Sequence, residues 1–259
     1  MLIAIPSRAR ANQRNHTFDN LPLALQAQAV FFVPKAEAPA YRERFGIAAV
    51  EGVKVDGIGL TRQHILNYTC SRITDGKVVM LDDDLSFFNR RADDATKLEK
   101  ATASSVFNLF ANIEYALETH AHVGVSAREG ANRCTDEHLY NTRMLRVLAY
   151  DARVLKLEKI RYDRLPVMED FDVTLQLLRK GYSNVVLNYW AQDQGTSNAP
   201  GGCSTYRTMD VQASGAHGLR DLHPDFVTVV QKETKEAWGG GTRTDVRIAW
   251  KKAYDSANK

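Results

Sequence analysis

Short apolar runs alternate with helix-compatible stretches along the first 190 residues. Residues 2–5 and 30–34 are β-rich runs, and residues 23–28, which suit a helix, lie between them. Further strands are predicted at residues 77–81, 122–126, 144–150 and 185–190. Strands that alternate with helices indicate an α/β fold whose sheet has parallel members.

Three longer helices are expected. Thr61 is placed as the N-cap of a helix over residues 62–69, after glycines that break regular structure. Apolar side chains recur at helical spacing from about residue 95 to residue 119 and predict a long amphipathic helix. A third helix is predicted over residues 173–180, before Gly181.

The chain changes character near residue 200. Residues 191–202 have a loop-like composition, and the segment from residue 205 onward is expected to be helical, with Gly239-Gly240-Gly241 as a hinge. We therefore predict a domain of residues 1–204 and a helical C-terminal extension, residues 205–259, packed on it.

The composition excludes several classes of protein. The chain has 259 residues, 44% hydrophobic and 25% charged, which is enough to bury a full core. No run approaches the roughly 20 apolar residues that cross a bilayer, and Pro6 interrupts the N-terminal run, so a cytoplasmic protein is expected. Three widely spaced cysteines argue against a disulfide framework or a thiolate zinc site. A net charge of +3 permits a polyanionic partner without requiring one.

Three consecutive carboxylates, Asp82, Asp83 and Asp84, directly follow the strand predicted at residues 77–81. Carboxylates this close repel one another, so the fold gains little from them unless a cation compensates. Mg²⁺ and Mn²⁺ take oxygen ligands and commonly bind one or two carboxylates together with substrate phosphates. A divalent metal site is the economical interpretation, and an acidic turn that caps the next helix is the alternative.

The residues around these carboxylates resemble the core of GT-A fold nucleotide-sugar glycosyltransferases. In that family a glycine, a short helix with Ala-Arg-Asn, a strand and an Asp-x-Asp motif occur in this order. Here Gly59, Thr61-Arg62-Gln63 and Asp82-Asp83-Asp84 take these places, and Thr-Arg-Gln departs from the family pattern. The resemblance implies a Rossmann-like, mostly parallel sheet flanked by helices, a nucleotide-sugar donor that is most often a UDP-sugar, and a Mn²⁺ or Mg²⁺ ion.

The same resemblance implies roles for individual residues near the donor. Asp82 and Asp84 correspond to the Asp-x-Asp pair that holds the metal, with Asp84 the more direct ligand, and Asp83 lies with them at the nucleotide. Arg62 corresponds to an arginine that helps to hold the nucleotide.

The opening loop and a late histidine complete this implied donor site. Pro6, Ser7 and Arg8 correspond to the loop that holds the nucleoside, although Arg8 could equally be a solvated charge. Several members complete the metal site with a late histidine, for which His217 is the first candidate and His223 the second. A satisfied surface or core histidine is the alternative for either.

Glu169 and Asp170 resemble the Glu-Asp motif that supplies the general base in many inverting members. The acceptor hydroxyl must lose a proton as it attacks the anomeric carbon, and a positioned carboxylate can take that proton. Asp170 is the candidate base, and a single displacement would invert the configuration of the sugar. A retaining course stays open, because the motif that indicates inversion is only two residues long. A carboxylate pair that caps the following helix is the alternative.

The segment at residues 198–207 stands where sugar-polymer synthases carry Gln-x-x-Arg-Trp, a motif absent here. With the two acidic motifs, it resembles the phage DNA-modifying glycosyltransferases associated with dioxygenases that hydroxylate thymine and 5-methylcytosine. The narrower resemblance implies that the acceptor is the hydroxyl of a 5-hydroxymethylpyrimidine in DNA, in an infected bacterial host if the chain is phage-encoded. Gly202 is then expected near the donor diphosphate, and Tyr206 and Arg207 are expected to close over the donor.

The basic residues are distributed in a way that is compatible with DNA. Arg128 and Arg133 lie in the polar stretch 127–138, which we expect to be an exposed loop, and Arg143 and Arg146 lie close to it. Arg243, Arg247 and Lys251 lie in a C-terminal helix candidate. Lysine and arginine contacts to phosphates give affinity that is independent of sequence. An amphipathic helix with solvated charges is the alternative for the C-terminal cluster.

Other functions stay open at this point. The enzyme could act on a glycan, a protein or a small molecule, and the chain could be a non-catalytic nucleic-acid-binding module, although such a module would be expected to have lost the carboxylates. A nucleotidyltransferase would usually carry a glycine-rich, lysine-bearing loop after the first strand, which residues 6–15 do not provide. Neither a membrane nor a protein partner is indicated.

Overall fold

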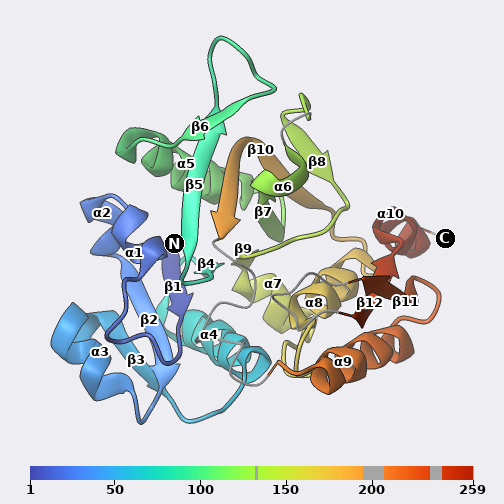
Figure 1. Ribbon diagram of the computed structural model, residues 1–259, viewed down its shortest axis with the longest axis horizontal. Coiled ribbons are helices and arrows are strands. Elements are labelled where there is room, and N and C mark those ends of the chain that lie inside the picture. Colours follow the sequence, from blue (N-terminus) through green and yellow to red (C-terminus); the bar gives the residue numbers. More distant parts are fainter. Residues whose placement is uncertain (132–133, 195–206, 234–240, 259) are drawn as a thin grey trace.

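The computed structural model describes residues 1–131, 134–194, 207–233 and 241–258, and a large mixed sheet forms its centre (Figure 1). The strands of this sheet are β1 (Leu2–Pro6), β2 (Ala29–Pro34), β3 (Val50–Val53), β4 (Lys77–Leu81), β5 (Leu85–Arg90), β6 (Leu98–Lys100), β7 (His122–Ala127), β8 (His138–Tyr140), β9 (Val147–Asp151) and β10 (Asn184–Gln194). They lie in the order β3-β2-β1-β4-β9-β7-β10-β5-β6, and β8 also pairs with β10.

The direction of the strands sets where the chain can build a site. Strands β3, β2, β1 and β4 are parallel neighbours, and β9 runs antiparallel between β4 and β7. The chain leaves β1 toward β2 on one side and β4 lies on the other, which makes a topological switch point where ligands commonly bind. The α/β prediction is confirmed, and the arrangement is that of a Rossmann-like GT-A fold.

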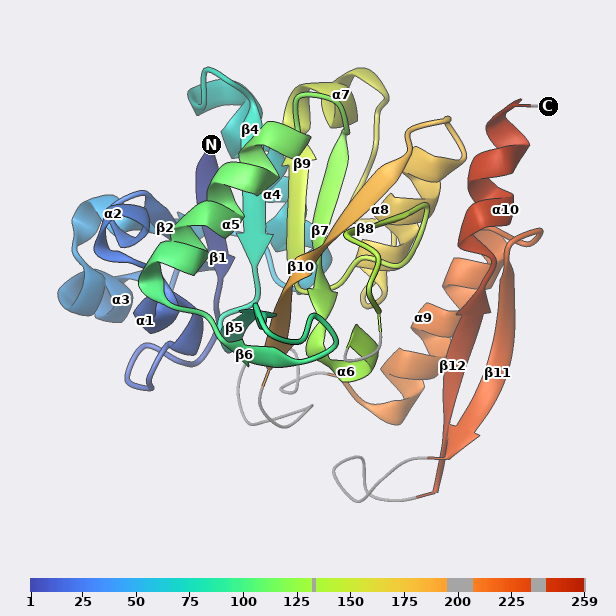
Figure 2. The ribbon, with the colours of Figure 1, turned by 90° about the horizontal axis from the view of Figure 1, so that it is seen from above.

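Helices cover both faces of the sheet (Figure 2). The helices are α1 (His16–Asn20), α2 (Leu23–Gln26), α3 (Ala38–Phe45), α4 (Ile58–Arg72), α5 (Ala103–Ala116), α6 (Arg128–Ala131), α7 (Ala152–Leu157), α8 (Glu169–Leu178), α9 (Met209–Leu222) and α10 (Trp250–Asp255), with short 3-10 turns at Ile47–Ala49 and Ser256–Asn258. Alternate residues of β1 point to opposite faces, so that Ile3 and Ile5 join the core under α5, whereas Leu2 and Ala4 join the core under α4, α7 and α8. Every described helix is too short or too polar to cross a bilayer.

The C-terminal segment was predicted to be helical, but only part of it is. Between α9 and α10 lie β11 (Val227–Glu233) and β12 (Thr242–Ile248), which pair as an antiparallel two-stranded sheet. Both strands are rich in valine and threonine, whose branched side chains favour extended backbone. Leu175 of α8, Leu219 of α9 and Val246 of β12 share one buried cluster, so the segment packs on the rest of the molecule. The boundary proposed at residue 204 lies outside the described residues.

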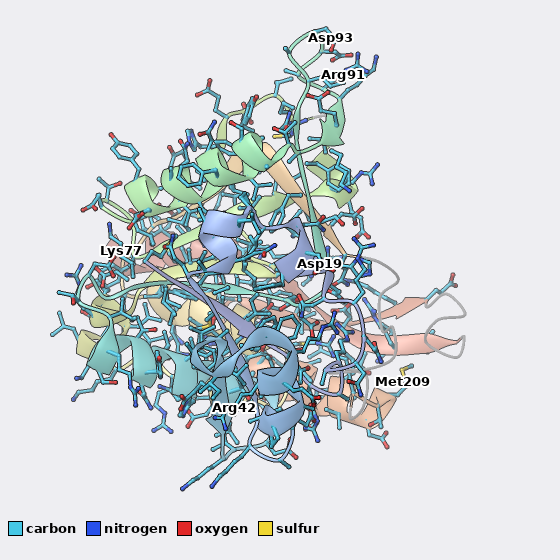
Figure 3. The ribbon with its side chains drawn as sticks, turned by 90° about the vertical axis from the view of Figure 1, so that its left-hand side faces the viewer. Asp19, Arg42, Lys77, Arg91, Asp93 and Met209 are labelled. Carbon is cyan, nitrogen blue, oxygen red and sulfur yellow. The ribbon has the colours of Figure 1, made fainter. Side chains whose placement is uncertain are left out.

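Other boundaries also differ from the sequence expectations. The predicted long helix is shorter, because α5 begins after Thr102, whose hydroxyl accepts the N–H of Ser105, and the residues before it form β5 and β6. The arm made by these two strands carries Arg91 and Asp93 at its tip (Figure 3). The stretch 127–138 holds the short helix α6 rather than a loop alone.

Helix α4 (Ile58–Arg72) begins before the expected start at residue 62, and its N-cap is Gly57. Gly59, expected to precede the helix, and Thr61, expected as the N-cap, therefore lie inside it. A Cβ atom at Gly59 would lie 2.8 Å from the carbonyl oxygen of Tyr162 and 3.0 Å from that of Leu165. The glycine therefore serves a close approach between α4 and the segment that leads into α8, rather than a break in the helix.

Candidate active site

A cavity of about 540 Å³ opens at the sheet edge where β1 and β4 end. The loop after β1, the residues after β4, the start of α8 and the β11–β12 hairpin all contribute side chains to its wall. A volume of this size falls in the range of ligand sites. The two acidic motifs found in the sequence therefore meet in one cavity.

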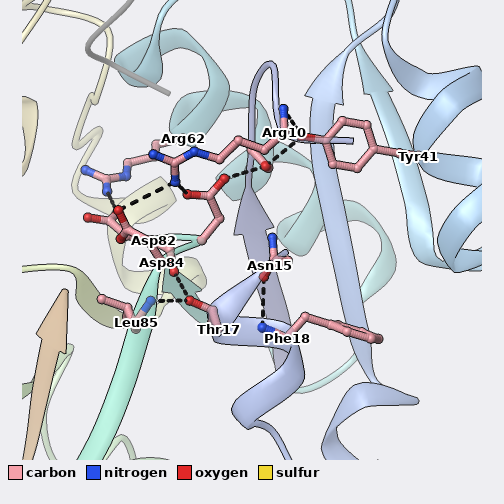
Figure 4. Close-up of polar contacts among 11 residues, drawn as sticks. Arg10, Asn15, Thr17, Phe18, Tyr41, Arg62, Asp82, Asp84 and Leu85 are labelled. Carbon is pink, nitrogen blue, oxygen red and sulfur yellow. Dashed lines mark hydrogen bonds and ion pairs between the residues drawn. The ribbon is translucent and has the colours of Figure 1, made fainter. Parts of the chain in front are cut away.

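The three aspartates after β4 have different surroundings. Figure 4 shows two of them, Asp82 and Asp84, with Arg62 and Arg10. Asp83 is buried, where it accepts a hydrogen bond from the Ser7 hydroxyl and pairs with Arg10, so it ties the loop after β1 to the end of β4. The side chains of Asp82 and Asp84 keep 32% and 26% of their surface exposed, against 8% for Asp83. Burial raises the pKa of Asp83 to about 6, against the opposing effect of Arg10.

Asp82 and Asp84 fit the donor set of a hard divalent cation. Both line the cavity with oxygen atoms, and Mg²⁺ or Mn²⁺ commonly takes one or two carboxylates and completes its shell with water and substrate phosphates. Arg62 occupies one oxygen of Asp82, at 2.9 Å from Nη2, and Arg10 lies 3.5 Å from Asp84. The predicted pair is thus available to a metal, while Asp83 is held by Ser7 and Arg10.

The two candidate histidines do not join this pair. His217 is exposed on α9 and is not among the residues that line the cavity. His223 is buried, accepts from Arg179 at Nδ1 and donates from Nε2 to Asp172 at 2.7 Å, so it is a satisfied core histidine. Within the described part of the chain, no group of three His, Cys, Asp or Glu side chains is arranged to hold a metal.

Arg62 connects the two acidic motifs. It is buried, and its guanidinium donates from Nη2 to Asp82 and from Nη1 to Glu169, the latter at 2.5 Å. The ring of Tyr162 lies 5.9 Å from its Cζ atom, and the Tyr162 hydroxyl lies 2.6 Å from that of Tyr150. A buried arginine between two carboxylates fixes their separation, because breaking either pair would leave an uncompensated buried charge.

Glu169 and Asp170 open helix α8 in different environments. The preceding residue, Met168, has a left-handed backbone with φ of +63°, an arrangement that is costly outside glycine and is found at functional sites. Burial raises the pKa of Glu169 to about 7, against the opposing effect of Arg62. Asp170 also lines the cavity but forms no ion pair with any described residue. Asp170 is therefore the carboxylate of the pair that is open to a substrate.

The cations of the cavity divide into paired and unpaired groups. Arg8 pairs with Asp56, and Asp245 pairs with both Lys232 and Arg243. Three further arginines line the cavity without a carboxylate partner among the described residues: Arg143, Arg146 and Arg207. The described wall carries eight arginine and lysine side chains against seven carboxylates, so its net charge is close to balanced. The three arginines without a carboxylate partner are the groups that suit the phosphates of a ligand.

The remaining predicted residues fall into three groups. Pro6, Ser7, Arg8 and Arg207 line the cavity, as does Arg243, which lies on strand β12 rather than on a helix. Arg128 pairs with Asp193 and stacks over Phe88, while Arg247, also on β12, and Lys251 of α10 are exposed, and these three lie outside the cavity wall. The predictions for Arg133, Gly202 and Tyr206 fall outside the described residues.

Several cavity residues were not predicted at the donor or catalytic site, and two of them, Arg143 and Arg146, were grouped only with the basic residues that suit DNA. Arg143 and Arg146 precede β9, and because β9 is antiparallel to β4, its start lies beside the end of β4. The backbone N–H of Asp82 accordingly donates to the carbonyl of Arg146 at 3.0 Å. The other missed residues are Arg10, Phe171, Lys232, Asp245 and Trp250. Phe171 could have been suspected from its position directly after the Glu-Asp motif.

A family model for the TET-associated glycosyltransferases matches residues 1–202. The chain belongs to this family. Two curated relatives are both named "Beta-glucosyl-HMC-alpha-glucosyl-transferase". The protein from Enterobacteria phage T2 is 27% identical over 188 residues, which cover 67% of this chain and 63% of the relative. The protein from Enterobacteria phage T6 is 27% identical over 195 residues, which cover 68% and 65%.

The chain thus spans less than two thirds of the length of these relatives. The family match confirms the resemblance to phage DNA-modifying glycosyltransferases that the acidic motifs indicated.

Proposed function

We propose that this chain transfers a sugar from a nucleoside diphosphate sugar, most simply a UDP-sugar, to the hydroxyl of a 5-hydroxymethylpyrimidine in DNA. The observation that carries the proposal is the Arg62 bridge, which holds Asp82 and Glu169 in one cavity beside Asp84 and Asp170. The family match and the names of the phage relatives support the same chemistry.

The donor is proposed to lie along the loop after β1. Pro6, Phe32, Pro34 and Val55 supply an apolar part of the cavity wall that suits a nucleoside. Asp82 and Asp84 would hold Mn²⁺ or Mg²⁺, which neutralises the negative charge that develops on a departing diphosphate.

Two arginines lie close to these donor-side carboxylates. Arg146 and Arg207 exert their charge on Asp82 and Glu169 respectively, and in that position they can stabilise the same leaving group.

Asp170 is proposed to accept the proton of the attacking hydroxyl. It faces the cavity without an ion-pair partner among the described residues, whereas Glu169 is held by Arg62. The predicted course is a single displacement with inversion at the anomeric carbon. The two acidic residues of α8 would then have separate roles: Glu169 positions the donor-side arginine, and Asp170 serves as the base.

The names of the relatives favour a second candidate for the acceptor. They describe transfer to a hydroxymethylcytosine that already carries a β-linked glucose, and they specify an α-linkage in the product. On this alternative the acceptor hydroxyl belongs to a sugar on the base. The linkage formed would also report on the stereochemical course.

The test is a transfer assay with Mn²⁺ or Mg²⁺, a panel of nucleotide sugars, and DNA that contains cytosine, 5-hydroxymethylcytosine, 5-hydroxymethyluracil or glucosylated 5-hydroxymethylcytosine. Nucleoside mass spectrometry should show a sugar-sized gain on a hydroxymethylated base, lost with chelator. A gain only on the glucosylated base would select the second candidate. Nucleotide release without any gain on DNA would contradict a DNA acceptor and direct the search to glycans, proteins or small molecules.

Two variants test the assigned residues in the same assay. Asp84→Ala should abolish transfer, whereas Asp93→Ala, an exposed carboxylate on the β5–β6 arm, should not. Asp170→Asn should lower kcat by about 10²- to 10⁴-fold, the usual worth of a general base. The matched control is Asp210→Asn, because Asp210 is an exposed carboxylate in the first turn of α9. Full activity in either Asp84→Ala or Asp170→Asn would remove that residue from the mechanism.

A further inference from the structure

Part of the cavity wall is aromatic, and an arginine lies over it. The guanidinium of Arg143 lies over the ring of Phe171, with its Cζ atom 4.8 Å from the ring centroid. Phe171 in turn meets Trp250 edge to face, with the ring centroids 5.7 Å apart and an interplanar angle of 80°. All three side chains line the cavity, and they come from the segment before β9, from α8 and from α10.

Arg143 has unused capacity for a ligand. The guanidinium of Arg143 contacts the ring of Phe171 and makes no hydrogen bond or ion pair with any described residue. The side chain is exposed where it lines the cavity. A planar cation backed by an aromatic ring is a surface on which a nucleobase can stack.

The hairpin next to this wall carries net positive charge. Asp245 is the carboxylate partner of both Lys232 and Arg243, at 3.0 and 2.9 Å, so two cations share one anion at the cavity wall. A phosphate beside the stacked base would meet this charge. The aromatic wall and the hairpin together thus offer the two features by which proteins hold a single nucleotide of a polynucleotide.

We propose that Arg143, Phe171 and Trp250 form the subsite for the acceptor nucleotide, which leaves the DNA helix so that its pyrimidine ring stacks on the Arg143 guanidinium and its phosphate contacts Lys232 and Arg243. This assignment rests on the proposed function. Phe171 directly follows Asp170. A pyrimidine stacked at this wall therefore brings its hydroxymethyl group toward Asp170, the carboxylate proposed to take the hydroxyl proton. A base still stacked in a duplex could not enter a cavity of this kind, which is why eversion is required.

The experiment compares Arg143→Lys with Arg72→Lys in the full chain. The matched control lies on α4, where the Arg72 guanidinium also stacks over an aromatic ring, that of Tyr68 at 4.9 Å, but outside the cavity. Arg143→Lys keeps the charge and removes the planar stacking surface. The KM for hydroxymethylated DNA should rise at least about tenfold, the scale of one base stacked on a planar side chain, with less than a twofold change in the KM for the nucleotide sugar. Arg72→Lys should change neither.

A second measurement reports eversion directly. A duplex that carries 2-aminopurine beside a single 5-hydroxymethylcytosine should brighten when the wild-type chain binds, and brighten less with Trp250→Leu at saturating protein. Equal KM values for DNA in wild type and Arg143→Lys, or no brightening with an active wild type, would overturn the acceptor subsite alone. Absence of transfer to any DNA by the wild type would overturn the proposed function, and this subsite with it.

Discussion

Replacement of Glu169 by glutamine should change how the stability of the protein depends on pH. Glu169 is buried, and burial raises its pKa to about 7 from the usual 4.5, although Arg62 opposes the shift and Asp170 adds to it. A carboxyl group with a raised pKa binds its proton more tightly in the folded state than in the unfolded state. Its contribution to stability is therefore fully present below pH 4.5 and is lost as the pH rises through 7.

The size of this effect follows from the two pKa values. At about 1.4 kcal/mol per pH unit, the gap corresponds to about 3 kcal/mol. Glutamine at position 169 cannot titrate, so Glu169→Gln does not lose this stability as the pH rises. The free energy of unfolding of the variant minus that of the wild type should therefore increase by about 3 kcal/mol between pH 4.5 and pH 8. For a protein of this size, this corresponds to roughly 6 to 12 °C in Tm.

Urea unfolding at a series of pH values, with chelator present to keep the aspartates metal-free, measures this difference. Glu137→Gln, which removes an exposed carboxylate, is the control for a general change in charge. If the curves of free energy against pH for wild type and Glu169→Gln run parallel, Glu169 does not hold its proton as the structure implies. The separate roles given to Glu169 and Asp170 would then lose their basis.

Two further substitutions test the packing that positions Arg62. Gly59→Ala should destabilise the protein by about 1 to 3 kcal/mol in urea unfolding, because its Cβ would meet the backbone carbonyls of Tyr162 and Leu165. The control is Gly218→Ala in α9, whose Cβ would meet only the end of the Leu165 side chain and should cost less. A smaller loss for Gly59→Ala than for Gly218→Ala would contradict the close approach. Tyr162→Phe leaves the buried Tyr150 hydroxyl without its partner and should cost about 1 to 3 kcal/mol, against little for Tyr182→Phe, whose hydroxyl bonds to Glu158 near the surface. Equal losses in thermal unfolding would show that the Tyr150–Tyr162 bond does not support the site.

The side of the cavity that holds the three aspartates after β4 could be predicted from the sequence because local patterns determine it. Strand β4 is a run of apolar residues, and it forms over the predicted residues 77–81. The aspartates that follow it reach the sheet edge because β1 and β4 are parallel neighbours, as the α/β alternation implied. The pairing of Asp83 with Arg10 was not predictable, since a charge in a loop after a strand is more often solvated.

The other wall of the cavity depends on features that local patterns do not carry. An apolar run shows that a strand forms but not its direction, and the antiparallel course of β9 is what brings Arg143 and Arg146 to the carboxylates. In the same way, the composition predicts a helix for the valine- and threonine-rich segment near the glycine run, but the segment forms strand β12. Arg243 was therefore predicted on a helix, whereas it lies on this strand. Where strand direction or a late hairpin decides the site, the residues can be identified only once the pairing is known.

The two sides of the cavity differ in how readily their residues can be substituted. The carboxylates, Arg62 and the loop after β1 are linked by buried ion pairs, so most single changes there leave an unpaired charge in the core. The aromatic wall and the hairpin instead meet the cavity through partly buried side chains such as Phe171 and Trp250. If the proposed acceptor subsite is correct, substitutions on that wall alter the acceptor at a small cost in stability, while the proposed donor site and its acidic motifs stay as they are. Acceptor preference should therefore be altered more readily by changes at Arg143, Phe171 and Trp250 than by changes at the residues that we propose to hold the donor.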